Sequence, residues 1–276
     1  MIRRVLVYTY GNHSHDHSIR AAATFAAHHQ AELIGLFVEP DVMGFTSIYG
    51  SYPLNLAQTF VDQQDGYEAK IKASFEEIVG HLDIQTQWHR TAEYEKQPRP
   101  SFYSDITFVG QVTEPNDIVF DGASFIDHLI TDTGLPTVVV PTDWSSTSFA
   151  QRPVLAWRET REAAGAVRHT LPLMRAAENV HVVSAYRKTD LEVELIDGIE
   201  ICQFLAEHEV KAEFFSVEIE SHKHSEAGAV CQHVNEHNRD LIIAGGYGHS
   251  RLREIVLGGM TRGLLAESPV PVLFSH

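Results

Sequence analysis

The sequence predicts an α/β protein with two domains in tandem, each an open five-stranded parallel sheet with helices on both faces. Short, nearly continuous runs of Val, Ile and Leu alternate with helix-length segments, as parallel strands buried on both faces require. The order of these elements occurs twice in the 276 residues. Between the two copies, residues 142–152 are rich in Ser and Thr and show neither the periodicity of a helix nor that of a strand. This composition is typical of a linker.

Each half opens with a β-α-β pattern. The first strands are expected at 5–8 and 154–157, and alanine-rich helices follow at 18–29 and 161–176. The next two strands, within 31–37 and 177–183, both start with Ala-Glu and then become apolar. This matched opening predicts two doubly wound sheets.

The later elements match as well. Long helices are expected at 54–79 and 191–207, and the fourth strands, 105–110 and 240–245, each lead from an aspartate to a glycine. A proline marks the start of each final strand. The halves differ at one point, because Pro98 and Pro100 interrupt the first half where 226–237 of the second is helix-compatible. We therefore predict a degenerate N-terminal domain at 1–142 and a C-terminal domain at 152–276.

Composition excludes some classes of function. The formal charge of −16 disfavours a general role on nucleic acid or anionic membranes. No run of about 20 apolar residues is present, and the first residues lead into a strand without a signal-peptide pattern, so a cytoplasmic protein is expected. Cys202 and Cys231 have no CxxC spacing and are interpreted as packing residues.

In doubly wound sheets, ligands bind at the carboxyl ends of the strands, where the strand order reverses. The loop after the fourth strand of the second half is rich in glycine there. Gly245 and Gly248 allow a phosphate to approach the main chain, while Gly258 and Gly259 precede the last helix, whose free N–H groups attract anions. The loop therefore predicts a path for a phosphate chain.

The spacing G-x2-G-x9-G, between a buried strand and a Pro-x-Pro-Val strand, resembles the nucleotide motif of the universal stress protein family. The tandem layout resembles that family's two-domain members over nearly the whole chain. The resemblance implies flavodoxin-like, Rossmann-like domains of the adenine nucleotide alpha hydrolase type, with ATP and Mg²⁺ as ligand. A related nucleotide or another small anion is the alternative ligand. The residues expected at this site are Ala156, Trp157, Arg158, Gly245, Tyr247, Gly248, His249, Gly258, Gly259, Met260 and Thr261.

Two positions depart from the family pattern. The family usually has Ser or Thr where Gly259 stands, and it usually offers an Asp in the loop that here carries Trp157, Arg158 and Glu159. Arg158 has two interpretations: a cation beside bound phosphates, or a surface arginine paired with Glu159 or Glu162. The surface interpretation is preferred.

Three functions remain open. The first is a non-catalytic stress-response module that binds nucleotide and signals through it. The second is slow ATP hydrolysis at the same loop, although no Walker lysine or Ser-His-Asp order is present. The third is a nucleotide-free member that acts through protein contacts.

The first half lacks the glycine loop. Thr113 stands in place of Gly248, and acidic residues nearby repel phosphates: Asp117, Asp121 and Asp127. It is expected to act as a structural partner in an intramolecular pseudo-dimer, and further homodimerisation stays open.

His13, His15 and His17 form a separate cluster after the first strand. Imidazoles bind zinc or nickel, but adjacent loop histidines commonly face solvent, and no CxxC or HExxH framework supports a site. No metal is expected, and these three are the candidates if one binds.

Overall fold

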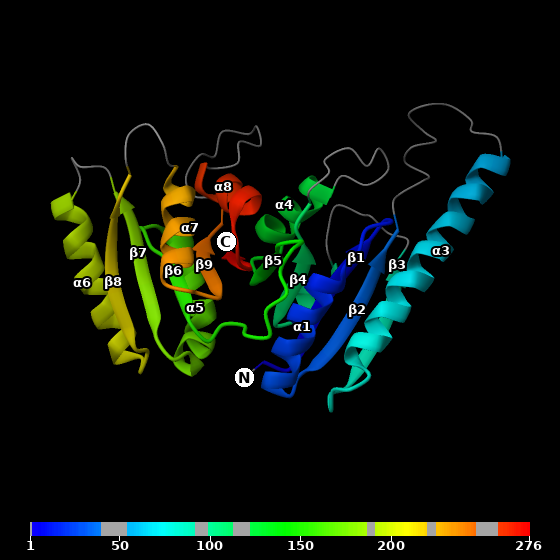
Figure 1. Ribbon diagram of the computed structural model, residues 1–276, viewed down its shortest axis with the longest axis horizontal. Coiled ribbons are helices and arrows are strands. Elements are labelled where there is room, and N and C mark those ends of the chain that lie inside the picture. Colours follow the sequence, from blue (N-terminus) through cyan, green and yellow to red (C-terminus); the bar gives the residue numbers. More distant parts are fainter. Residues whose placement is uncertain are drawn as a thin grey trace. The chain divides into compact units, whose positions relative to one another are not determined.

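The structure is a computed structural model that describes residues 2–39, 54–91, 99–112, 122–186, 191–219, 225–246 and 259–276. The chain divides into two compact units, Met1–Thr133 and Gly134–His276 (Figure 1). Each unit is a sheet of mostly parallel strands flanked by helices, so the predicted α/β fold class is confirmed. The predicted linker at 142–152 lies inside the second unit, and the predicted domain limits stay a prediction.

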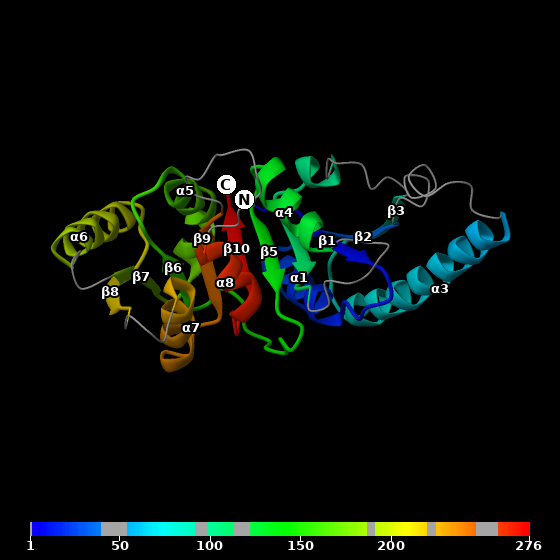
Figure 2. The ribbon, with the colours of Figure 1, turned by 90° about the horizontal axis from the view of Figure 1, so that it is seen from above.

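The first unit has four parallel strands in the order β3-β2-β1-β4. In Figure 2, α1 and α3 lie on one face of this sheet and α4 on the other. The short 3-10 helix η1 stands before β4, where the second unit has a full α-helix. The elements are β1 (Arg4–Tyr10), α1 (Asp16–His29), β2 (Glu32–Val38), α3 (Leu54–Val79), β3 (Thr86–Thr91), η1 (Arg99–Tyr103), β4 (Ile106–Gly110) and α4 (Gly122–Asp132).

The second unit repeats this arrangement. Counted from β6, its parallel strands have the same 3-2-1-4 order, β8-β7-β6-β9, followed by β10. Figure 2 shows α5 and α6 on one face and α7 and α8 on the other. The elements are β5 (Thr137–Val140), β6 (Pro153–Ala156), α5 (Arg161–Ala176), β7 (Val180–Tyr186), α6 (Leu191–Glu207), β8 (Ala212–Glu218), α7 (Glu226–Glu236), β9 (Leu241–Gly245), α8 (Gly259–Glu267) and β10 (Val272–Ser275).

β5 is the exception to the parallel pattern. It comes from the end of the first sequence repeat, yet it falls in the second compact unit and pairs antiparallel with β10, with Val139 opposite Val272. All four residues of both strands are buried, and three consecutive residues of each, 138–140 and 272–274, are apolar.

An aspartate anchors the first strand of each repeat. In the first unit, Asp105 accepts hydrogen bonds from the backbone N–H groups of Arg3 and Arg4, at 2.7 and 2.9 Å. In the second, Asp240 accepts from the backbone N–H groups of Gln151 and Arg152, both at 2.9 Å. The acidic residue before each fourth strand therefore ties that strand to the start of the first.

The two cysteines are free thiols, and Cys231 is buried. Burial raises the pKa of the Cys231 thiol to about 11, so this side chain is an inert packing group at neutral pH.

Of the helices in the described ranges, none combines the length and hydropathy that crossing a bilayer would need.

Candidate functional site

The candidate site lies at the carboxyl ends of β6 and β9, where the strand order of the second unit reverses. A pocket of about 340 Å³ opens there, and its floor is formed by Ala156 at the end of β6 and by Ala244 and Gly245 at the end of β9. Val183 and Ala185 of the neighbouring strand β7 line one side. Small side chains at the strand ends leave this volume unfilled, which is the usual basis of a ligand site in a doubly wound sheet.

The start of helix α5 packs directly against the floor. Thr160 is the N-cap, and its hydroxyl oxygen accepts a hydrogen bond from the backbone N–H of Ala163 at 3.2 Å. A Cβ atom on Gly245 would lie only 2.6 Å from the nitrogen of Ala163 and 2.7 Å from the carbonyl carbon of Glu162. Glycine at 245 is therefore required by the close approach of helix and strand.

Helix α8 begins at the other side of the pocket. Its first three residues, Gly259, Met260 and Thr261, all line the pocket, and Thr261 is buried. A Cβ atom on Gly259 would meet nothing within 4 Å in the part of the chain that the structure describes. The amino end of α8, where the helix dipole is positive, therefore lies at the pocket.

The pocket carries charges of both signs. Arg158 forms an ion pair with Glu226, from the first turn of α7, with 2.9 Å between Nη2 and Oε1. Glu162 is buried, and its Oε2 atom has no hydrogen-bond partner among the described residues. The same holds for the indole nitrogen of Trp157. A ligand with both a hydrogen-bond acceptor and a cation would match these two atoms.

Comparison with known proteins identifies the family. A model of the universal stress protein family matches residues 136–276, which is just over half of the chain. The chain belongs to the universal stress protein family. The match covers the unit that contains the pocket, and the tandem arrangement fits a two-domain member.

Solved structures resemble the chain over its whole length. A universal stress protein from Archaeoglobus fulgidus DSM 4304 has a TM-score of 0.67 at 13% identity and covers 98% of this chain and 97% of its own. A protein of unknown function from Pseudomonas aeruginosa PAO1 has a TM-score of 0.60 at 13% identity, covering 99% and 92%. Identities this low show a shared fold alone. No curated protein matches this universal stress protein in sequence.

The structure brings together the predicted residues that it describes. Ala156, Trp157, Arg158, Gly245, Gly259, Met260 and Thr261 all line the one pocket. Tyr247, Gly248, His249 and Gly258 lie outside the described residues. Arg158 pairs with Glu226, and neither of the partners that the sequence suggested is bonded to it in the described structure.

Sequence reasoning missed several residues that line the pocket. Val183 and Ala185 could have been found, because they lie in the carboxyl-terminal half of β7, the strand beside β6, and such sites form at the carboxyl ends of strands. The position of Thr160 at the pocket could also have been predicted, since a threonine before an alanine-rich run is a typical N-cap. The positions of Glu162 and Glu226 could not, because the sequence does not tell which helical carboxylates face the strand ends.

The equivalent position in the first unit is filled by histidine side chains. A Cβ atom on Gly110, at the end of β4, would lie 2.6 Å from His17 Nε2 and 3.7 Å from His15 Nδ1. His15 Nε2 is 2.7 Å from the carbonyl oxygen of Tyr10, and burial lowers the pKa of His15 to about 4. His13 is exposed. In the described ranges these three histidines do not form a group with three converging ligand atoms, whereas three others do, as described below.

Proposed function

We propose that this universal stress protein binds an adenine nucleotide, ATP with Mg²⁺, in the pocket of its second unit and uses it as a signal. The observation that carries the proposal is the position of the pocket, at the strand-order reversal and facing the amino end of α8. This combination supplies a hydrophobic floor together with backbone N–H groups for phosphate oxygens.

The polar atoms of the pocket support a nucleotide over a simple anion. Phosphates would lie against Gly259, Met260 and Thr261, where the helix dipole favours negative charge. The buried Glu162 carboxylate would repel a bare phosphate, but it suits a magnesium ion that the phosphates also hold. Bound Mg²⁺ would offset the phosphate charge, and Glu162 would orient it from the protein side.

The base and ribose would occupy the part of the pocket lined by Ala156, Val183 and Ala185. Trp157 would donate its indole N–H to an acceptor on this half of the ligand, satisfying a buried donor that has no partner in the described structure. Arg158 stands at the pocket with its charge offset by Glu226, so it would contribute little to phosphate binding unless that pair opens.

A nucleotide-free member that acts through protein contacts is the second candidate. Among the described residues that line the pocket, two are carboxylates, Glu162 and Glu226, and one is a guanidinium, Arg158, so these three side chains do not by themselves attract an anion. Binding of ATP distinguishes the two candidates.

Two glycine variants supply the test. Gly259→Val adds a branched side chain at the start of α8, where Gly259 lines the pocket, and should reduce ATP affinity at least about tenfold by calorimetric titration with Mg²⁺. Gly165→Val is the matched control, because Gly165 is also a helical glycine with nothing near its Cβ position and does not line the pocket. Equal affinities in both variants would place the nucleotide elsewhere. No binding to the parent chain would select the nucleotide-free candidate.

A further inference from the structure

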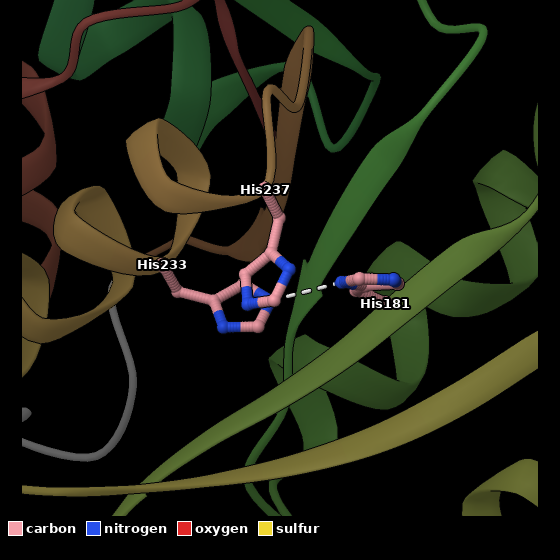
Figure 3. Close-up of side chains that lie close together, drawn as sticks. All are labelled: His181, His233 and His237. Carbon is pink, nitrogen blue, oxygen red and sulfur yellow. Dashed lines mark hydrogen bonds between the residues drawn. The ribbon is translucent and has the colours of Figure 1, made fainter.

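Three histidines converge at the edge of the second unit opposite the nucleotide pocket. His181 lies near the amino end of β7, His233 lies in the last turn of α7, and His237 is the C-cap of that helix. Figure 3 shows the three rings turned towards one another, one from the strand and two from the helix end. Their candidate ligand atoms all lie within 4.8 Å of one another.

The local structure explains why the rings meet. His233 and His237 are four residues apart, so they lie on the same side of α7, one turn apart. Their ring centroids are 4.2 Å apart with 33° between the planes. His181 points from the sheet towards this helix end, and its Nδ1 is 2.9 Å from Nε2 of His233. Two rigid elements therefore hold the set in place.

His181 and His233 are buried, with 4% of each residue exposed. Phe215 of β8 closes an apolar wall, with its ring centroid 4.1 Å from that of His181 and 4.8 Å from that of His233. An apolar wall beside imidazole ligands limits the access of solvent to a bound metal.

We propose that His181, His233 and His237 form a zinc site, with Nδ1 of His181, Nε2 of His233 and one ring nitrogen of His237 as ligands. Three imidazoles suit Zn²⁺ and its late first-row neighbours. His237 is exposed, so the metal can enter from that side and a water molecule can complete a tetrahedral set. The site is independent of the nucleotide pocket, since it lies at the opposite ends of the strands.

Arg239 affects the metal affinity of the proposed site. Its guanidinium donates a hydrogen bond to Nε2 of His181 and another to Oδ1 of Asn179, at 2.8 Å for the latter. Because Nε2 of His181 accepts this hydrogen bond, a neutral His181 ring carries its proton on Nδ1, which donates to Nε2 of His233. If zinc bound Nδ1, the proton of the neutral ring would be on Nε2, facing the N–H groups of the guanidinium. Arg239 therefore opposes the metal and lowers the affinity of the site.

The first test measures Zn²⁺ affinity of the full chain by competition with a chromogenic chelator. His237→Ala should weaken binding at least about tenfold, and the variant should fold normally because His237 is exposed. His208→Ala is the matched control: this histidine also follows a helix end and stacks on a phenylalanine, with 4.3 Å between its ring centroid and that of Phe204, but it lies outside the cluster. Equal affinities in parent, His237→Ala and His208→Ala would overturn the proposal.

A second variant tests the ligand atoms. Arg239→Gln replaces the opposing cation with an amide whose carbonyl oxygen can accept the Nε2–H of zinc-bound His181. It should tighten Zn²⁺ binding about tenfold, and Co²⁺ added in place of zinc should give the intense visible absorption of a tetrahedral site. Unchanged affinity in Arg239→Gln would show that the metal does not bind through Nδ1 of His181, which would overturn this ligand set.

Discussion

Gly245 and Gly259 both line the pocket, but the structure predicts opposite responses to substitution. In Gly245→Ala the new Cβ would lie 2.6 Å from the backbone nitrogen of Ala163, whereas ordinary contacts begin near 3.4 Å. The start of α5 would have to retreat by roughly 0.8 Å, the difference between these distances. Because the contact is with backbone atoms, no side-chain rotation can relieve it, and we expect a cost of about 2 to 3 kcal/mol.

Gly259→Ala should behave differently. Nothing in the described structure lies within 4 Å of its Cβ position, and alanine favours a helix over glycine by about 0.5 to 1 kcal/mol in helix interiors. Stability should therefore stay the same or rise slightly.

Thermal unfolding followed by far-UV circular dichroism measures both changes. A loss of about 2 to 3 kcal/mol corresponds to roughly 5 to 10 °C in Tm for a domain-sized unit, and Gly245→Ala should show it while Gly259→Ala does not. The same two variants should separate in ATP titration, since Gly245→Ala moves the helix that carries Glu162. If both variants unfold at the parent's temperature, the close approach of α5 to β9 is wrong.

Three further outcomes are expected. Asp240 accepts hydrogen bonds through both carboxylate oxygens, whereas Asp105 accepts through one. In urea unfolding, Asp240→Asn should therefore lower the free energy of unfolding by about 2 to 3 kcal/mol and Asp105→Asn by under about 1 kcal/mol. Equal losses in the two variants would contradict the anchoring roles. Because burial lowers the pKa of His15 to about 4, the unfolded chain takes up its proton first. The stability from neutral His15 should be complete above about pH 6.5 and fall by about 3 kcal/mol towards pH 4, a slope that His15→Gln should reduce. Glu226→Gln should free Arg158, raise ATP affinity a few-fold and steepen its salt dependence in calorimetry; no change would leave Arg158 without a role in binding.

Much of the fold could be predicted from the sequence because parallel strands buried on both faces leave a clear pattern. Helices α3, α5 and α6 begin and end at the predicted residues, and α5 shows why: Thr160 caps its start and the apolar pattern continues to Ala176. The place of β5 was not predictable. Its apolar run indicates a buried strand, but the choice of β10 as an antiparallel partner depends on contacts far apart in the sequence.

The candidate site could be predicted where it depends on chain order and could not where it depends on side-chain direction. The strand-end rule places Ala156 and Gly245 together, and the structure does so as well. The cluster of His181, His233 and His237 was not among the expected sites, because the histidines that stand close together in the sequence are His13, His15 and His17. The i, i+4 spacing of His233 and His237 in a predicted helix was the available signal, but nothing in the sequence places His181 beside them.

Nucleotide binding is proposed for the second unit alone, at one site. Native mass spectrometry of the parent chain, titrated with ATP and Mg²⁺, tests it most directly because it counts bound ligands. We expect one nucleotide to bind per chain and no second one to follow at saturation. Two nucleotides per chain would contradict the assignment of the site to the second unit alone, and none at millimolar ATP would contradict nucleotide binding by this protein.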